Sequence, residues 1–228
     1  MLKSYVKRTG HFTAAQRKAY DTLAQNIIIP FSEETLDFNK VFKTKNNNVT
    51  GQRHEINVII EIGFGSGFAT AEIAQANPEK NYLGIEVHRP GIGRLLWEIN
   101  ERALSNIRII EYDAADAVPK MIPPCSLDGI HLFFPDPWPK KRHHKRRLVQ
   151  RPFTETLANC LKPGGYFYMV TDWEDYALFA VEELNAAAGL RNAYEKFAAQ
   201  QSWRPVTRFE QKGLLKDHVI REIYLIKN

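Results

Sequence analysis

The amino-acid sequence predicts an α/β fold with a doubly wound, mostly parallel sheet and helices on both faces. From residue 57 onward, short apolar runs rich in β-branched and aromatic residues alternate with stretches of helical composition. Several of these runs are apolar almost without interruption, which is typical of strands covered on both faces. A glycine-rich turn follows the first run, where the first strand of such a sheet leads into its first helix.

The predicted elements follow in a regular order. Strands are expected at residues 57–63, 81–88, 107–114, 127–135 and 165–172. Helices are expected at residues 66–76, 91–104, 148–161 and 173–188. A stop and turn before the fifth strand is predicted by Lys162, Pro163, Gly164 and Gly165. Residues 217–227 alternate enough to form one more strand, antiparallel at or near an edge.

The N-terminal part does not follow this alternation. Residues 10–29 predict a helix with an arm before it, and residues 43–52 are polar and rich in Asn, which predicts a loop. The sequence contains no internal repeat. We therefore expect an N-terminal arm, helix and polar loop at residues 1–52 and one α/β domain at residues 53–228.

Length and composition exclude several classes of protein. The chain has 228 residues, of which 44% are hydrophobic and 25% charged, so it is neither disordered nor collagen-like. Its two cysteines, Cys125 and Cys160, cannot form a disulfide scaffold and lack the spacing of a zinc site. No apolar run approaches the roughly 18 residues of a membrane helix, and residues 1–13 contain no apolar leader. We expect a soluble protein of the reducing cytoplasm.

The excess positive charge is concentrated in one short segment. The chain has 31 Lys and Arg against 26 Asp and Glu, a net charge of +5. Residues 140–147, with the sequence KKRHHKRR, carry six of the basic residues and no acid, which leaves 25 basic against 26 acidic residues elsewhere. Such a dense cationic segment indicates an anion-binding patch, with nucleic acid as the first candidate.

The glycine-rich turn indicates a cofactor but excludes two common ones. Residues 61–67 have the sequence EIGFGSG, whose glycines let a ligand approach the backbone. Phe68 stands where a dinucleotide-binding turn needs a small residue, so NAD is disfavoured. No Gly-Lys-Ser or Gly-Lys-Thr occurs, which disfavours a nucleoside triphosphate bound in a Walker A loop.

Acidic residues end the neighbouring strands. Glu86 closes the second predicted strand, where an acid commonly accepts hydrogen bonds from a ribose diol. Asp113 closes the third strand and could accept from an adenine amino group. Because carboxyl ends of parallel strands share one edge of the sheet, these two residues and Glu61 would surround a cationic nucleoside.

The fourth strand leads into an unusual segment. Asp136 lies between Pro135 and Pro137, and prolines hold a chain extended, so we expect its carboxylate to be presented rigidly at the sheet edge. Trp138 would offer a stacking face for a base. The basic segment follows directly. Its two histidines are adjacent, a poor geometry for chelation, and we expect no metal site.

Together, three motifs resemble the bacterial tRNA (guanine-N7-)-methyltransferase family: residues 135–147 (PDPWPKKRHHKRR), residues 61–67, and Thr207-Arg208-Phe209-Glu210. The resemblance extends from about residue 5 to the end. It implies a seven-stranded Rossmann-like class I methyltransferase domain at residues 53–228. It also implies methyl transfer from S-adenosylmethionine to N7 of a guanosine in the tRNA variable loop, with tRNA as partner. From the residues we expect no membrane and no metal, and the sequence leaves open whether the protein is a monomer or a homodimer. The family pattern has Arg where this chain has His11.

The same resemblance implies roles for individual residues. The implied cofactor contacts are Glu61, Gly63, Gly65, Gly67, Glu86, Asp113 and Asp136, of which Asp136 is also the catalytic residue. The implied substrate contacts are Lys140, Asp172, Thr207, Arg208, Phe209 and Glu210. We expect Lys141, Arg142, Lys145, Arg146 and Arg147 to form an RNA phosphate patch. For the guanine edge, Asp136 is the first candidate acceptor and Glu210 the second.

Alternatives remain at this point. Asp136-Pro137-Trp138 is also similar to the D-P-P-Y type motif of amino methyltransferases, in which the acid and a proline carbonyl would hold an exocyclic amine of a base. The chain could instead be an RNA-binding module with a vestigial cofactor fold. Asp172 could cap the helix that follows it rather than contact substrate.

Overall fold

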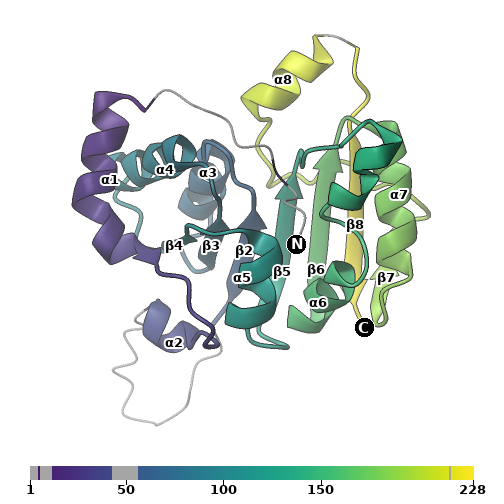
Figure 1. Cartoon of the computed structure of the whole chain (residues 1–228), viewed down its shortest axis with the longest axis horizontal. Helices are drawn as coiled ribbons and strands as arrows, with labels where there is room; N and C mark the ends of the chain where they lie inside the picture. Colours follow the sequence, from purple (N-terminus) through teal and green to yellow (C-terminus); the bar gives the residue numbers. More distant parts are fainter. Residues whose placement is uncertain (1–4, 6–11, 43–55, 216) are drawn as a thin grey trace.

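The computed structural model describes residues 5, 12–42, 56–215 and 217–228 (Figure 1). The predicted arm residues 8–11, including His11, and the predicted polar loop at residues 43–52 lie outside this part. The side chains of Arg208 and Lys212 are outside it as well. No helix in these described ranges is long and apolar enough to cross a membrane.

The described residues form one eight-stranded sheet in the order β1-β4-β3-β2-β5-β6-β8-β7. Its strands are β1 (Ile28–Ile29), β2 (Val58–Ile62), β3 (Asn81–Ile85), β4 (Ile107–Ile110), β5 (Leu127–Phe133), β6 (Leu161–Thr171), β7 (Leu190–Asn192) and β8 (Arg221–Lys227). Neighbouring strands are parallel except that β8 runs antiparallel to β6 and to β7. The predicted α/β class with a mostly parallel sheet and an antiparallel final strand is confirmed.

The sheet has one strand more than the implied seven. The additional strand is β1, which has two residues and pairs with β4 at one edge. The three-residue β7 at the other edge was also missing from the sequence pattern. Two or three residues are too few to display an alternation of apolar and polar side chains, so only pairing in the folded sheet defines these strands.

The helices are α1 (Ala14–Ile27), α2 (Phe38–Val41), α3 (Phe68–Ala76), α4 (Arg89–Glu101), α5 (Ala114–Met121), α6 (Phe153–Cys160), α7 (Glu174–Asn185) and α8 (Arg208–Leu214), with a 3-10 helix η1 (Lys141–Arg146). The helix predicted within residues 10–29 corresponds to α1, and the four helices predicted after it correspond to α3, α4, α6 and α7. The pattern did not predict α5, which is only eight residues long and contains Pro119. It also did not predict α8, which begins with a capping box between Thr207 and Glu210.

Alternate side chains of the strands enter two separate cores. On β2, Val58, Ile60 and Ile62 belong to the core that includes residues of α5, α6 and α7. Ile59 belongs to the core on the opposite face, with residues of α1, α3 and α4. This period of two with both faces buried explains the nearly continuous apolar runs of the sequence. Figure 1 shows the two groups of helices around the sheet and α8 standing apart above it.

Two glycines of α4 allow other segments of the chain to pack closely against this helix. A Cβ on Gly93 would lie 2.3 Å from the Phe12 ring, so the start of α1 fits closely against α4. A Cβ on Gly91 would lie 1.9 Å from the Gly65 carbonyl oxygen, so α4 begins directly beside the glycine-rich turn. Residues 12–29 are therefore packed into the same body as the sheet. The division of the chain at residue 52 stays a prediction.

Candidate active site

A cavity of about 870 Å³ opens at the carboxyl ends of β2, β3 and β5. This edge is where ligands bind in open parallel sheets. Its walls come from the turn after β2, the start of α4, the segment after β5 and the loop that leads into α8. The cavity brings together the predicted site residues Glu61, Gly63, Gly65, Glu86, Asp113, Asp136, Asp172, Thr207 and Phe209.

The glycine-rich turn presents bare backbone to this cavity. Gly63 and Gly65 have φ values of +72° and +58°, and among the described residues no atom beyond the glycine and its two chain neighbours lies within 4 Å of a Cβ added to either one. The space beside them is therefore open to a ligand. Gly67 is different, since a Cβ there would lie 2.6 Å from Leu95. Gly67 serves the packing of the turn against α4 and does not line the cavity.

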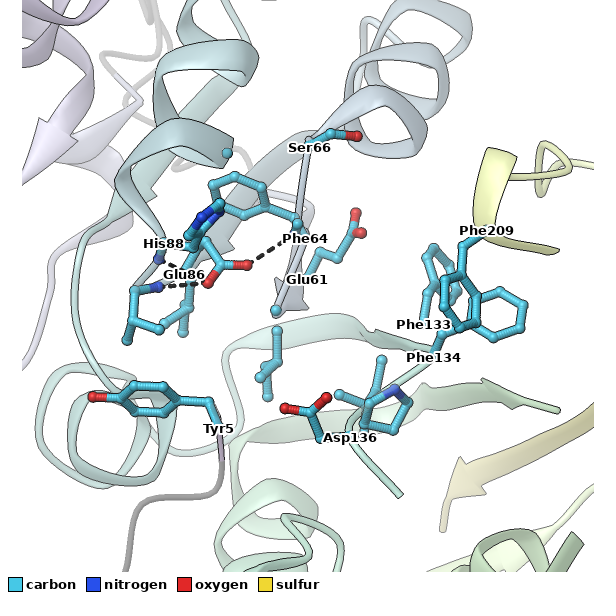
Figure 2. A pocket seen from close by; sticks show the side chains of 18 of the residues that line it. Tyr5, Glu61, Phe64, Ser66, Glu86, His88, Phe133, Phe134, Asp136 and Phe209 are labelled. Carbon is cyan, nitrogen blue, oxygen red and sulfur yellow. Dashed lines mark hydrogen bonds between the residues drawn. The ribbon is translucent and has the colours of Figure 1, made fainter. Parts of the chain in front are cut away.

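Glu86 holds the turn to the end of β3. Its carboxylate accepts hydrogen bonds from the backbone N–H groups of Gly65 at 2.9 Å, Val87 at 2.7 Å and His88 at 3.0 Å (Figure 2). Three hydrogen bonds to one carboxylate fix its orientation. The acid predicted for a ribose diol thus also organises the backbone on which a ligand would rest.

Glu61 lies deeper, at the end of β2. It is only 3% exposed and accepts a hydrogen bond from the Thr70 hydroxyl of α3 at 2.8 Å. Burial raises the pKa of Glu61 to about 7, the bond from Thr70 opposes this rise, and the charge of Glu86 adds to it. A cation bound nearby would favour the ionised form of this carboxyl group.

Two further acids reach the cavity from loops. Asp113 follows β4 by three residues and accepts from the Ala115 N–H at 3.0 Å, so it caps α5 while it lines the cavity. Asp136 follows β5, and Figure 2 shows its carboxylate pointing into the cavity. The backbone on either side turns sharply, with φ of +49° at both Phe134 and Trp138.

The loop after Asp136 is anchored by Arg147. The side chain of this arginine is 1% exposed, and its Nε donates to the Pro137 carbonyl at 3.1 Å. Its guanidinium also pairs with Asp175 and lies 5.0 Å from the ring centres of Tyr176 and Phe179. The prediction that Arg147 belongs to the phosphate patch is wrong, because its guanidinium is buried and held by these contacts, away from any phosphate at the surface.

Trp138 is also a structural residue. It is 7% exposed, and the guanidinium carbon of Arg146 lies 3.6 Å from its ring centre. The His143 ring packs edge-on against it. The prediction of a stacking face for a base is wrong, because cation–π and edge contacts of η1 already cover the ring.

The remaining basic side chains lie on the surface around η1. Those exposed are Lys140, Lys141, Arg142 and Lys145. Arg146 is half-buried and donates to the Tyr5 carbonyl at 3.2 Å. Lys140, implied as a substrate contact, precedes η1 and does not line the cavity. The cationic surface is thus smaller than the sequence implied.

The implied substrate residues divide into two groups. Asp172, Thr207 and Phe209 line the cavity. Asp172 accepts from His218 Nδ1 at 2.9 Å, and the N-cap position of α7 is Trp173, so the helix-cap alternative for Asp172 is wrong. Glu210 is 3% exposed, does not line the cavity, and accepts two hydrogen bonds from Arg204 at 2.6 and 2.8 Å. Those bonds remove Glu210 as an acceptor for a guanine edge.

Sequence reasoning missed several side chains of the cavity wall, namely Phe64, His88, Tyr112, Phe134, Trp173 and His218. Most of them lie within two residues of an acid that the sequence analysis placed at the end of a strand. Their position in the sequence could therefore have indicated them. His218 had none, because its partner Asp172 lies 46 positions earlier in the chain. Among the described residues, no group of three or more His, Cys, Asp or Glu side chains could hold a metal ion.

Comparison with known proteins identifies the family. Residues 55–223 match the model of a family described as "Putative methyltransferase". The tRNA (guanine-N(7)-)-methyltransferase of Nitrosomonas eutropha is 46% identical over 226 residues, which cover 99% of this chain and 96% of that protein. The enzyme of the same name from Chromobacterium violaceum is 46% identical over 222 residues, which cover 97% of this chain and 94% of that protein. The chain belongs to the tRNA (guanine-N(7)-)-methyltransferase family.

Solved structures agree on the fold. The aminoglycoside resistance methyltransferase NpmB1 superposes with a TM-score of 0.53 at 16% identity, covering 75% of this chain and 87% of that one. TrmN from Thermus thermophilus superposes with a TM-score of 0.54 at 18% identity, covering 75% of this chain and 44% of that one. At such low identity these matches confirm the class I methyltransferase fold alone.

Substitution of Glu61 by Gln should change how stability depends on pH. Burial raises the pKa of Glu61 from its ordinary value of 4.5 to about 7 in the folded chain. The folded state therefore holds this proton longer, and the wild type loses stability as pH rises through the window between these values. The loss amounts to about 3 kcal/mol. E61Q cannot ionise and should gain that amount relative to wild type between pH 5 and 8, as measured by urea unfolding.

Gln keeps an acceptor for Thr70, so E61Q is close in shape to the wild type. Burial lowers the pKa of His131 to about 3, which also makes stability depend on pH, but both proteins carry that histidine. Only the difference between the two curves is therefore diagnostic. Parallel curves across this range would contradict the assignment.

Proposed function

We propose that this protein transfers the methyl group of S-adenosylmethionine to N7 of a guanosine in tRNA, and that this guanosine lies in the variable loop. Family membership supports the reaction. The observation that carries it in this chain is the ring of carboxylates Glu61, Glu86, Asp113 and Asp136 around one cavity beside a bare glycine turn. The free Cys125 and Cys160 support a place in the reducing cytoplasm.

The cavity fits the charge of S-adenosylmethionine better than that of a phosphate cofactor. The cofactor carries a sulfonium and an ammonium group, and the carboxylates just named face the same space. The open sides of Gly63 and Gly65 provide room for it against the backbone. The Nε2 atom of His88, which is buried and lacks a hydrogen-bond partner among the described residues, offers a further polar group in this wall.

Each acid would hold a different part of the cofactor. Glu86, oriented by three backbone N–H groups, would accept from the ribose hydroxyls, and Asp113 would accept from the adenine amino group. Glu61 would face the cationic end. When bound, S-adenosylmethionine supplies an electrophilic methyl group.

The acceptor atom needs little help from a base. Guanine N7 has a free lone pair at neutral pH, so no proton has to be removed before the new bond forms. The purine instead gains positive charge, and the protein must align the base and stabilise that charge. A carboxylate about 4 Å away contributes up to roughly 4 kcal/mol at an effective dielectric of about 20, equal to about three decades in rate. We assign this role to Asp136.

The exposed cations of η1 would hold the tRNA backbone. Lys140, Lys141, Arg142 and Lys145 project from the segment that follows Asp136, so phosphates bound there would lie near the reacting base. They would position the tRNA without reading its sequence.

Methylation of an exocyclic amine is the alternative reaction, and it would use a proline carbonyl next to the acid as a second acceptor. The Pro137 carbonyl accepts one hydrogen bond from Arg147, which leaves one of its two lone pairs for that role. The 7-deazaguanosine substitution described below separates the two reactions. A binding module without catalysis is disfavoured by the complete set of acids and open glycines around the cavity.

Replacement of the target atom provides the direct test. The protein should transfer labelled methyl groups to an unmodified tRNA transcript and none to the same transcript with 7-deazaguanosine at the variable-loop position, because that base lacks the accepting nitrogen. Label in both transcripts would move the reaction to another atom or nucleotide. No label in either, with tRNA still bound, would contradict catalysis.

The variant Asp136→Asn should lower kcat about 100- to 1,000-fold, because it removes the charge that stabilises the methylated purine. The dissociation constant for tRNA should change less than threefold, since Asn keeps the shape of the loop. Asp21→Asn, on an exposed position of α1, is the matched control and should keep wild-type turnover. Nearly full turnover of D136N would contradict the catalytic role.

The double variant K141A/K145A should reduce the salt dependence of tRNA binding. Each lost phosphate contact lowers the slope of log affinity against log salt by about 0.7 to 0.9, so we expect a slope smaller by about one to two. The measurement is the dissociation constant for tRNA at several salt concentrations between about 50 and 200 mM. The control K40A/K196A changes two exposed lysines elsewhere and should keep the wild-type slope. If the wild type and both double variants have equal slopes, η1 is not part of the RNA-binding surface.

A further inference from the structure

The segment around α8 is tied into the core at its beginning. We call residues 206–215 and 217–219 the α8 segment. Just before it, Arg204 is 3% exposed and pairs with Glu210 of α8 and with Glu222 of β8 at 2.7 Å. The Arg204 Nε also donates to the Tyr168 hydroxyl of β6 at 3.1 Å. These buried bonds fix the first turn of α8 to the sheet.

The end of the segment is held by a different and more exposed contact. Asp172, directly after β6, accepts from Nδ1 of His218 at 2.9 Å. The side chains are 16% and 45% exposed, respectively. The backbone N–H of His218 donates to the Gly213 carbonyl at 3.1 Å. A Cβ on Gly213 would lie 3.6 Å from the Asp172 carboxylate, so the last turn of α8 rests beside this pair.

Little apolar burial supports the segment between these two ends. Phe209 is 56% exposed, Leu214 50%, Leu215 86% and Val219 61%. The Phe209 ring packs against Phe134, with ring centres 5.1 Å apart, at the cavity wall (Figure 2). Since side chains this exposed bury little area, the polar contact at His218 has a large share in the placement of the end of α8.

The placement of this segment shapes the cavity. Thr207, Phe209 and His218 come from the α8 segment, and Asp172 comes from the end of β6, yet all four line the same space. If the His218 contact opens, Asp172 loses its hydrogen bond and the second half of α8 loses its connection to β6. Both changes alter the wall that the incoming base must meet.

We propose that His218 is a positioning residue for the substrate: it donates to Asp172, orients that carboxylate in the cavity and holds α8 over it. An ionised carboxylate only accepts, so Nδ1 must carry the proton in this bond. His218 acts through Asp172 and the backbone of α8, and not on the reacting atoms. The inference rests on the proposed function, because the base that enters is the tRNA guanosine.

The test compares three variants of the full chain. H218A should raise the KM for tRNA about tenfold, the size expected from one lost hydrogen bond to a charged group. In H218A, kcat and the dissociation constant for S-adenosylmethionine should stay within about twofold of the wild-type values. A change of that size is smaller than the loss of one hydrogen bond would cause. H218N should restore the wild-type KM, because the amide nitrogen of Asn can take the place of Nδ1. V219A removes an exposed side chain outside the cavity wall and serves as the matched control.

Hydrogen exchange gives a readout that does not depend on activity. The amides of α8 should exchange faster in H218A than in wild type, H218N or V219A, while the core strands should not change. If the wild type transfers no methyl group to tRNA, the proposed function is wrong. The exchange rates would still test the hydrogen bond between His218 and Asp172. An active wild type with H218A equal to V219A in both KM and exchange would overturn the positioning role. So would an H218N that behaves like H218A, or a loss confined to kcat.

Discussion

The in-register parallel pairing of β2 with β3 and β5 is the constraint on which the site depends. Ile62 of β2 pairs with Ile85 of β3, and the hydrogen bond from the Gly63 N–H to the Ile85 carbonyl continues that register into the turn. On the other side of β2, Glu61 pairs with His131 of β5. Parallel strands end at a common edge, so residues distant in the chain leave the sheet as neighbours. The carboxylates of the cavity come from positions at or shortly after these ends, and a slip of one residue would send Glu61 to the other face.

Gathering acids at one edge creates repulsion, and the fold handles it in two ways. The Glu86 carboxylate accepts hydrogen bonds from three backbone N–H groups, which take the place of water around it. Glu61 has one hydrogen bond and almost no exposure, and burial raises its pKa to about 7, which reduces its negative charge near neutral pH. The basic side chains lie outside, around η1. A cationic cofactor and a polyanionic substrate can therefore meet at one cavity without competing for the same charges.

Several residues that look functional in the sequence are scaffolding for those that act. Arg147 uses its charge on Asp175 and the Pro137 carbonyl, and so fixes the loop that presents Asp136. Glu210 serves the buried pair with Arg204. Charged groups this buried are stable only with such partners, and the partners then define where the loop or helix starts. The result is a rigid frame around Asp136 and a lightly packed α8 beside it.

The sequence by itself determined the α/β class, the glycine turn, the acids at the strand ends and the family, because each depends on local residue types at fixed spacing. The sequence did not predict short elements such as β1 and α8. Strand pairing defines β1 and the capping box between Thr207 and Glu210 defines the start of α8, and neither produces a periodic pattern. The sequence did not predict burial either: nothing in KKRHHKRR distinguishes Arg147 from its exposed neighbours. Only the tertiary structure decided that Arg147 and Trp138 face inward and that His218 meets Asp172. These contacts join side chains from separate elements, and their energies depend on an environment that exists only after the chain has folded.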